Sequence, residues 1–329
     1  MSVLRFDHVS VRYRDVSAVS DVSLAVTEGE IFALVGESGC GKTTLAMAIM
    51  GLLPTSASVA GTIEFLGRDL TALSDAERTS LRGDRISMVF QDPGSALDPA
   101  FSVGEQIAET MRAHRPLGGR EAKARAVQLL EEVGIPDAAR RYRDPPHRFS
   151  GGMQQRVVIA TALANEPALL IADEPTAALD VTIQAQILSL MRELRRRHRT
   201  TILLIAHDFG VVAQLCDRAG VLYAGQLVEV APVTELFAGA RHPYTSTLLA
   251  ALPTRAQERG SLAAAPGQVP DLVAPPPGCR FQPRCPLRRS ECDLVPPLAP
   301  VADHLTACWA TPETQQAGQE LLALGGNAA

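Results

Sequence analysis

Residues 36–43 read GESGCGKT, and they directly follow the short apolar run IFALV at residues 31–35. The segment matches the pattern G-x-x-x-x-G-K-[ST], in which glycines let backbone N–H groups surround phosphate oxygens. The apolar run before it predicts a buried strand, and the apolar stretch at residues 45–53 predicts a helix after it. A strand, a glycine-rich loop and a helix in this order indicate an α/β fold with phosphate bound at the helix N terminus.

The residue types in this loop fit nucleotide chemistry. Lys42 would neutralise the β and γ phosphates, and the Thr43 hydroxyl would ligate Mg²⁺. Cys40 is interpreted as a small loop residue, with a redox-sensitive thiol as the lesser alternative, because no partner thiol is adjacent in sequence. The predicted nucleotide-binding residues of this segment are Gly36, Glu37, Ser38, Gly39, Cys40, Gly41, Lys42, Thr43 and Thr44.

The composition excludes several classes of protein. The chain has 329 residues, 46% hydrophobic and 20% charged, which is ordinary globular usage for one large or two moderate domains. A net charge of −5 argues against a protein that coats nucleic acid, and 4% aromatic residues argue against base-stacking platforms. The sequence has no apolar stretch of roughly 18 residues and no signal-peptide layout. We therefore expect a cytosolic or membrane-peripheral chain.

Hydrophobic patterning predicts a largely parallel sheet flanked by helices. Alternating residues near the N terminus predict antiparallel strands, and helical spacing predicts a helical insertion between strands from residue 95 to 148. After Pro253 the composition shifts to Ala, Pro and Gly, which is typical of a linker. Further buried strands are expected at residues 86–90, 169–172, 202–206 and 221–223, and helices at residues 103–111 and 122–133.

Two acidic residues follow the predicted strand at residues 169–172. Asp173 would hold Mg²⁺ or its water, and Glu174 would activate the attacking water. Such a pair is otherwise a solvated turn, but the phosphate loop upstream favours the catalytic interpretation. His207 follows the predicted strand at residues 202–206 and would either contact the γ phosphate or be structural.

Residues 149–156 read FSGGMQQR and precede a predicted helix. Ser150, Gly151 and Gly152 would form either an anion-binding nest or a simple helix cap. With the phosphate loop upstream and the acidic strand end downstream, the order resembles the ATP-binding-cassette (ABC) ATPases over residues 1 to about 250. The signature here is FSGGM where that family more often has LSGGQ, and its Ser and both Gly residues are kept.

The resemblance implies a role for each matching residue. Tyr13 would stack on adenine, and Gln91 would contact Mg²⁺ and report nucleotide state to membrane subunits. Glu174 would be the catalytic base, His207 the switch histidine, and residues 178–180 a loop that crosses a dimer interface. The implied catalytic residues are therefore Glu174, His207 and Gln91; the implied Mg²⁺ ligands are Thr43, Gln91 and Asp173; and the implied nucleotide contacts also include Ser150, Gly151, Gly152 and Asp180.

Two C-terminal stretches indicate a subgroup within this family. Residues 241–253, with Arg-His-Pro-Tyr-Thr at their start, and residues 277–286 look like the C-terminal extension of the dipeptide, oligopeptide and nickel importer ATPases. One departure is Pro145-Pro146, where Tyr-Pro is more usual. The resemblance implies a P-loop NTPase fold with a parallel core sheet, an antiparallel β subdomain and a helical subdomain at about 95–160. We expect an ABC ATPase domain at 1–253 and a linker and Cys-containing extension at 254–310, and the low apolar content of residues 311–329 predicts a disordered tail.

The resemblance also implies partners. Two such ATPases, identical or paralogous, would act at the cytoplasmic face of the membrane on two permease subunits, with an external solute-binding protein acting indirectly and no nucleic acid. Dipeptides, longer peptides, nickel chelates and other small solutes remain open. A DNA-repair or chromosome ATPase would have a long coiled coil inside the cassette, but only 106 residues separate Lys42 from Phe149 and they show no sustained heptads. A translation factor would carry two cassettes on one chain, and an exporter commonly has a fused membrane domain, which this sequence does not show.

Four of the six cysteines gather near the C terminus with the spacing C-x5-C-x6-C-x15-C; they are Cys279, Cys285, Cys292 and Cys308. A reducing compartment favours metal ligands over disulfides. Structural zinc sites usually contain a C-x2-4-C knuckle, which is absent from this spacing, whereas four thiolates on longer loops suit an iron–sulfur cluster. Some importers of the resembling group carry such cysteines around a 4Fe-4S cluster. We therefore expect 4Fe-4S, with zinc and metal-free thiols as the lesser alternatives.

Overall fold

A computed structural model of the chain describes residues 1–177, 179–252 and 267–310. Two compact units can be distinguished, each built from separate stretches of sequence. Unit 1 comprises Met1–Leu4, Val26–Glu30 and Phe65–Ile205, and unit 2 comprises Arg5–Ala25, Ile31–Glu64 and Ala206–Ala329. The predicted tail at 311–329 and most of the predicted linker lie outside the described residues. Within the described ranges, no helix has the length and apolar character needed to cross a membrane.

Unit 2 contains a mixed sheet with the strand order β11-β12-β10-β9-β3. Strand β3 (Ile31–Val35) pairs in parallel with β9 (Arg218–Tyr223), and β10 (Gln226–Pro232) pairs antiparallel with β9. All of β3 is buried, as its continuous apolar sequence predicts. Strands β11 (Ala299–Val301) and β12 (His304–Thr306) come from the C-terminal extension and continue the sheet beyond β10.

A second group of strands in unit 2 is formed by β1 (Ser2–Tyr13), β2 (Val16–Thr27) and β4 (Ala57–Phe65), in the order β2-β1-β4. The helices are α1 (Lys42–Met50), α9 (Phe209–Leu215), α10 (Val233–Ala238) and α11 (Pro243–Ala250), with 3-10 turns η2 (Gln282–Arg284) and η3 (Ser290–Asp293). Helix α1 ends at Met50 and does not continue to residue 53, because Gly51 adopts a left-handed C-cap with φ 62°.

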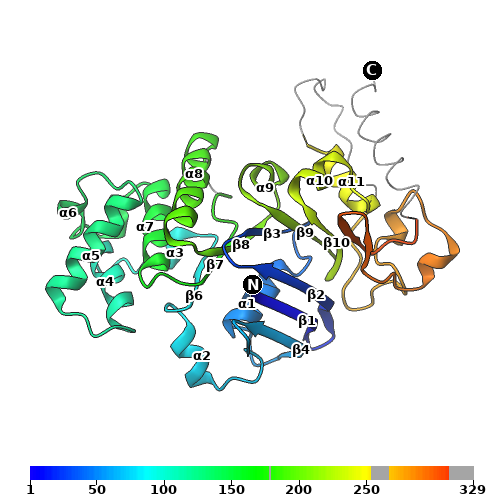
Figure 1. Cartoon of the computed structure of the whole chain (residues 1–329), viewed down its shortest axis with the longest axis horizontal. Helices are drawn as coiled ribbons and strands as arrows, with labels where there is room; N and C mark the ends of the chain where they lie inside the picture. Colours follow the sequence, from blue (N-terminus) through cyan, green and yellow to red (C-terminus); the bar gives the residue numbers. More distant parts are fainter. Residues whose placement is uncertain (178, 253–266, 311–329) are drawn as a thin grey trace. The chain divides into compact units, whose positions relative to one another are not determined.

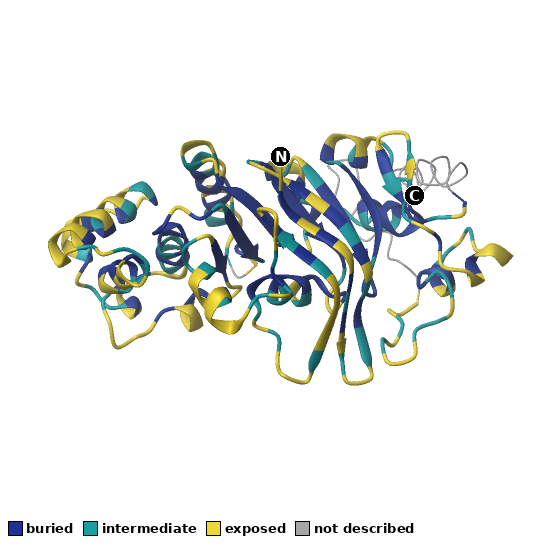
Figure 2. Cartoon of the chain, turned by 60° about the horizontal axis from the view of Figure 1, so that its bottom comes forward, coloured by how far each residue is buried: buried dark blue, intermediate teal, exposed yellow. Residues whose placement is uncertain are grey.

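Unit 1 contains the parallel strands β8 (Thr201–Ala206), β7 (Leu169–Asp173) and β6 (Ile86–Val89), which lie side by side in that order. The short strand β5 (Arg68–Asp69) also belongs to unit 1 and is not part of this group. These strands and those of unit 2 confirm the predicted buried strands. Strands β3, β6, β7 and β8 are buried along their whole length, whereas most of β4 is not buried. Figure 2 accordingly shows both dark blue and yellow stretches on the strands.

The predicted helical insertion at residues 95–148 is confirmed by α4 (Val103–Arg112), α5 (Gly119–Glu132), α6 (Ala138–Arg141) and the 3-10 turn η1 (Pro146–Arg148). Unit 1 also contains α2 (Asp75–Leu81), α3 (Pro93–Ala96), α7 (Gly151–Leu163) and α8 (Val181–His198). Helix α5 buries Ala122, Ala126 and Leu130, which lie four residues apart on one face. Helix α5 contacts α4, α6 and α7, which lie around it in Figure 1.

Candidate nucleotide-binding site

The phosphate loop lies between β3 and α1, where the sequence predicts it. The Nζ of Lys42 donates to the carbonyl oxygens of Gly36 at 2.8 Å and Glu37 at 3.0 Å. Lys42 is only 5% exposed. Its ammonium is therefore held inside the loop, where it can exchange carbonyl partners for phosphate oxygens.

Two glycines of the loop are required by close contacts. A Cβ at Gly36 would lie 2.1 Å from the carbonyl oxygen of Leu222, and one at Gly41 would lie 2.6 Å from that of Ala18. Gly41 also has φ 104° as the N-cap of α1. A glycine at this position has no side chain to cap the helix, and an anion can take that place.

Cys40 is almost fully buried in the loop. Burial raises the pKa of its thiol, although the nearby Lys42 acts in the opposite direction. A buried thiol with a raised pKa is unreactive, because the thiolate is the nucleophile. The structure therefore supports the interpretation of Cys40 as a small loop residue.

Tyr13 and His207 also belong to unit 2. Tyr13 ends β1, and its hydroxyl donates to Oγ1 of Thr44 at 3.5 Å, so the aromatic ring lies beside the start of α1. His207 is exposed directly after β8, and the next residue, Asp208, caps α9 by accepting from the N–H of Gly210 at 2.7 Å. The adenine and γ-phosphate contacts of these two residues stay predictions.

In unit 1, parallel pairing brings two predicted catalytic residues together. Val89 of β6 lies opposite Ala172 of β7, so that Gln91 and Glu174 follow the two strands at the same edge. Nε2 of Gln91 donates to Oε2 of Glu174 at 2.9 Å. The motifs predict a role for each residue, and the tertiary structure adds their contact.

Glu174 has a strained backbone. Its φ of 45° lies in the left-handed region, which costs a non-glycine residue roughly 1–2 kcal/mol. The N–H of Glu174 donates to the carbonyl oxygen of Ile205 at 3.0 Å and helps to hold this conformation. Strain that the surrounding structure maintains clusters at active sites, which fits the predicted role of Glu174.

Asp173 ends β7 and is 6% exposed, so its carboxylate lies at a buried strand end as predicted. Among the residues that the structure describes, no three Asp, Glu, His or Cys side chains are arranged to hold a metal ion. Mg²⁺ in nucleotide sites takes few protein ligands and completes its shell with phosphate and water oxygens. The oxygen donors of Thr43, Gln91 and Asp173 fit that chemistry, and their coordination of Mg²⁺ stays a prediction.

The signature residues occupy a helix start. Ser150 is the N-cap of α7, and its Oγ accepts from the N–H of Met153 at 3.4 Å. A Cβ at Gly152 would lie 2.6 Å from Cγ2 of Ile183 on α8, so the glycine permits close helix packing. Asp180 is the N-cap of α8 and accepts from two backbone N–H groups at 3.0 Å. Capping is therefore one function of Ser150 and Asp180, and their contact with nucleotide stays a prediction.

The four late cysteines interact in the extension. The N–H of Cys279 donates to the carbonyl oxygen of Cys292 at 2.9 Å. Burial raises the pKa of Cys279 to about 11 and that of Cys285 to about 12, and the charges of Cys292 and Cys308 add to both shifts. Nevertheless, no three of the described Cys, His, Asp or Glu side chains form a metal-ion site. The predicted metal centre therefore has no support from this arrangement.

Comparison with known proteins places the chain in a family. Residues 19–177 match the family model described as ABC transporter, and residues 228–292 match the model described as oligopeptide/dipeptide transporter, C-terminal region. The dipeptide transport ATP-binding protein DppD of Bacillus subtilis (strain 168) is 48% identical over 298 residues, which cover 89% of each chain. The chain belongs to the ABC transporter family.

Other proteins of the ABC transporter family are also similar to this chain. The oligopeptide transport ATP-binding protein OppD of Salmonella typhimurium is 45% identical over 296 residues, covering 90% of this chain and 88% of the relative. A solved dimeric structure of the ATP-binding cassette MJ0796, in a post-hydrolysis state bound to ADP and Pi, has a TM-score of 0.62 and 29% identity. It covers 70% of this chain and 98% of its own. These matches establish the fold predicted from the motifs, an ABC ATPase with parallel and antiparallel sheets.

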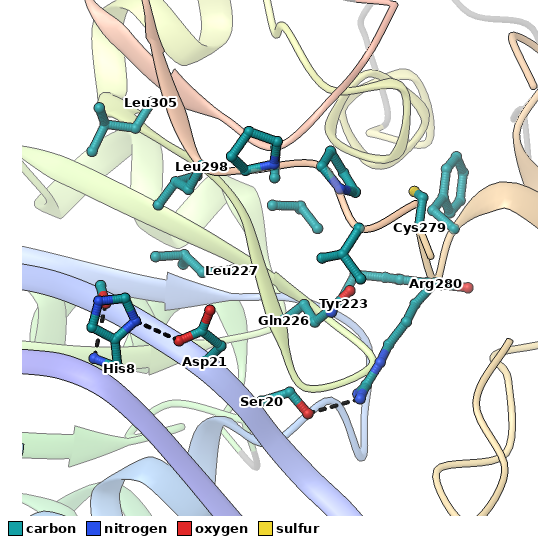
Figure 3. A pocket seen from close by; sticks show the side chains of 17 residues that line it. His8, Ser20, Asp21, Tyr223, Gln226, Leu227, Cys279, Arg280, Leu298 and Leu305 are labelled. Atoms are coloured by element: carbon teal, nitrogen blue, oxygen red, sulfur yellow. Dashed lines mark hydrogen bonds and ion pairs between the residues drawn. The ribbon is translucent and has the colours of Figure 1, made fainter. Parts of the chain in front are cut away.

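The C-terminal extension of this ABC transporter chain is anchored by contacts that its motifs do not predict. Arg280 donates to Oγ of Ser20 at 2.7 Å and also to the carbonyl oxygen of Ala224. Figure 3 shows Arg280 reaching toward Ser20, beside a pocket of about 510 Å³ between the extension and the strands. Arg284 pairs with Glu37 of the phosphate loop at 2.8 Å. Arg280 and Arg284 lie among the cysteines of the extension in the sequence, and no motif indicates their contacts.

Proposed function

We propose that this chain is the ATP-hydrolysing subunit of an ABC importer that takes up dipeptides or oligopeptides. The observation that carries the proposal is the combination of a complete phosphate loop with a C-terminal region that matches oligopeptide/dipeptide transporters over residues 228–292. The relatives DppD and OppD, which match 89% and 90% of the chain, are named for dipeptide and oligopeptide transport.

In the proposed mechanism, the loop amides, Lys42 and Thr43 bind the phosphates and Mg²⁺, and Tyr13 stacks on adenine. Glu174, oriented by its hydrogen bond from Gln91, accepts a proton from the water that attacks the γ phosphorus. The bond from the γ phosphorus to the bridging oxygen breaks, and ADP leaves with that oxygen. His207 contacts the γ phosphate and links hydrolysis to the conformational change.

The proposed assembly contains two ATPases, identical or paralogous, in which Ser150 of each chain faces the phosphate loop of the other. Closure around two MgATP molecules moves two permease subunits at the cytoplasmic face of the membrane, and hydrolysis resets them. A solute-binding protein delivers the solute to the permeases. Nickel or another small solute is the alternative cargo within the same group of importers.

Reconstitution tests the proposal. The chain is assembled in proteoliposomes with the permeases and binding protein encoded nearest to it, and MgATP-dependent uptake of labelled dipeptide, pentapeptide and chelated nickel is compared. We expect peptide uptake that Lys42→Ala abolishes. Uptake of nickel alone would select the alternative cargo, and unstimulated ATPase activity with every solute would contradict an import function.

The extension carries a further proposal, that Cys279, Cys285, Cys292 and Cys308 bind a 4Fe-4S cluster. The support comes from the sequence, which places four cysteines within 30 residues at the spacing C-x5-C-x6-C-x15-C. Such a cluster would supply one-electron redox chemistry when bound. Anaerobic purification followed by iron, sulfide and zinc quantification tests it: about four irons per chain are expected, one zinc would select the zinc alternative, and neither metal would leave free thiols.

A further inference from the structure

The C-terminal extension contacts the phosphate loop through a two-pronged ion pair. Nη1 and Nη2 of Arg284 donate to Oε2 and Oε1 of Glu37 at 2.8 and 3.2 Å. The side chain of Arg284 is 4% exposed and that of Glu37 is 30% exposed. Two parallel hydrogen bonds in a largely buried setting fix the orientation of both groups, unlike a single bond between exposed side chains.

Aromatic side chains hold Arg284 in place. Its Cζ lies 5.7 Å from the ring centroid of Tyr223 and 5.9 Å from that of Phe281. The Tyr223 hydroxyl also accepts from Nη1 at 3.3 Å. The hydrogen bond with Glu37 is the main cause that raises the pKa of Arg284, so the guanidinium stays charged. The extension thus presents a fixed positive group to the loop.

The backbone of Glu37 is held by the same aromatic group. Its N–H donates to the hydroxyl of Tyr244 at 3.0 Å. Tyr244 packs against Tyr223 and Phe281, with ring centroids 4.5 and 5.4 Å apart. Both the main chain and the side chain of one loop residue are therefore anchored to a rigid cluster that includes the extension.

Glu37 affects the loop in two ways. Its carboxylate places a negative charge in a loop whose expected ligand is an anion, and like charges repel. Its carbonyl oxygen accepts from Nζ of Lys42 at 3.0 Å, so a displaced Glu37 would also move a group that holds Lys42. Pairing with Arg284 counters both effects.

We propose that Arg284 is a positioning residue for nucleotide binding: it neutralises Glu37 and holds the phosphate loop in its binding conformation. The inference rests on the proposed role of residues 36–43 in phosphate binding. It makes the C-terminal extension a support of the nucleotide site, although the extension lies far from the loop in sequence.

The test measures equilibrium binding of the non-hydrolysable analogue Mg-AMPPNP to the full-length chain, together with KM and kcat for MgATP. For Arg284→Gln we expect about tenfold weaker binding, the scale of one lost charge-assisted hydrogen bond, with the loss in KM rather than kcat. Arg284→Lys should recover part of the affinity, because Lys keeps the charge but not the two-pronged geometry. The matched control is Arg288→Gln. Arg288 is an exposed residue of the extension whose Nη2 lies 3.7 Å from Oδ1 of Asp293, and the affinity of this variant for Mg-AMPPNP should stay within about twofold of wild type.

Folding of the extension is followed separately through Trp309, the single tryptophan of the chain. Its Nε1 donates to the carbonyl oxygen of Leu294 at 3.2 Å, within the extension. We expect the emission of Arg284→Gln to match wild type. If Arg284→Gln binds Mg-AMPPNP weakly and its Trp309 emission is that of an unfolded extension, the proposal is overturned. Wild-type affinity of Arg284→Gln for Mg-AMPPNP would overturn it as well.

The double variant Glu37→Gln/Arg284→Gln separates pairing from general damage. It should bind Mg-AMPPNP more tightly than Arg284→Gln alone, because the uncompensated carboxylate is gone. Binding as weak as that of the single variant would overturn the role of the pair. A wild-type chain that does not bind Mg-AMPPNP would contradict the proposed function itself, whereas equal binding by wild type and Arg284→Gln would contradict only this inference.

Discussion

Glu174 combines the features that a general base at a strand end requires. It follows the buried strand β7, it has φ 45°, and its carboxylate accepts from Gln91 at 2.9 Å. The hydrogen bond from Gln91 orients the carboxylate, which reduces the reorganisation needed during reaction.

We expect Glu174→Gln to lower kcat for MgATP by roughly 10²–10⁴-fold, the contribution of a positioned general base, while nucleotide binding is retained. The amide keeps the size of the side chain but cannot take the proton. Steady-state hydrolysis and equilibrium binding of MgATP measure the two effects. Glu131→Gln, on an exposed position of α5, is the control; a Glu174→Gln enzyme with wild-type kcat would exclude Glu174 as the base.

His242 gives the fold a pH-sensitive residue away from the loop. It is 1% exposed, its Nδ1 accepts from the N–H of Tyr244 at 3.1 Å, and burial lowers its pKa to about 4. The unfolded chain takes up a proton near pH 6.5, whereas the folded chain does so only near pH 4. The contribution of His242 to stability is therefore complete above pH 6.5 and is lost as the pH falls toward 4.

We predict that His242→Asn flattens the pH dependence of the free energy of unfolding across this window. Asn can still accept from the N–H of Tyr244 but does not titrate. The difference in slope between wild type and variant should approach about 1.4 kcal/mol per pH unit, measured by urea unfolding at several pH values. Parallel curves for the two proteins would show that His242 is not the titrating group.

At the scale of elements, the hairpin β11–β12 shows how the extension joins the sheet. Strand β12 pairs with β10 through Thr306 opposite Glu229. Nδ1 of His304 lies 2.7 Å from Oε1 of Glu229, and both side chains are buried. Glu229 also accepts from the N–H groups of Arg241 and His242, at 2.7 and 3.1 Å. One buried carboxylate therefore ties the start of α11 and the extension to β10.

His304→Ala should loosen the extension. The loss of a buried, charge-assisted hydrogen bond is expected to cost about 2 kcal/mol, while the two backbone donors keep Glu229 partly satisfied. Urea unfolding followed by Trp309 emission measures the effect on the extension. Asp303→Ala, an exposed change in the same hairpin, should leave the midpoint unchanged; equal shifts in both variants would argue against the His304–Glu229 contact as the anchor.

At the scale of the whole molecule, the proposed active site needs two chains. In the proposed dimer each signature faces the phosphate loop of the partner, so Lys42 and Ser150 of one chain would serve different sites.

A mixing experiment tests the shared site. Lys42→Ala and Ser150→Arg should each be inactive alone, whereas an equimolar mixture should recover up to about a quarter of wild-type ATPase activity, because half of the dimers would contain one intact site. ATPase rates are measured on mixtures at increasing total concentration. Activity of either variant alone, or a mixture that stays inactive although mixed dimers form, would contradict a site built from both chains.

Local sequence patterns were sufficient to predict the fold family and the residues of each motif. The phosphate loop at residues 36–43, the acidic end of β7 and the Ser-Gly-Gly helix start are local, because each needs a specific backbone geometry from consecutive residues. Apolar runs likewise identified β3, β6, β7, β8 and β9, since buried parallel strands lack polar alternation.

Contacts between residues that are distant in sequence depend on how the whole chain folds. Glu37 and Arg284 are 247 positions apart, and Gln91 and Glu174 are 83 positions apart, so packing that no local pattern encodes brings each pair together. Strand β10 and the hairpin that extends it escaped prediction for the same reason: short segments acquire strand structure from their partners in the sheet. The physical cause is that a motif depends on local backbone geometry, whereas an ion pair or a sheet edge depends on where the whole chain brings its parts together.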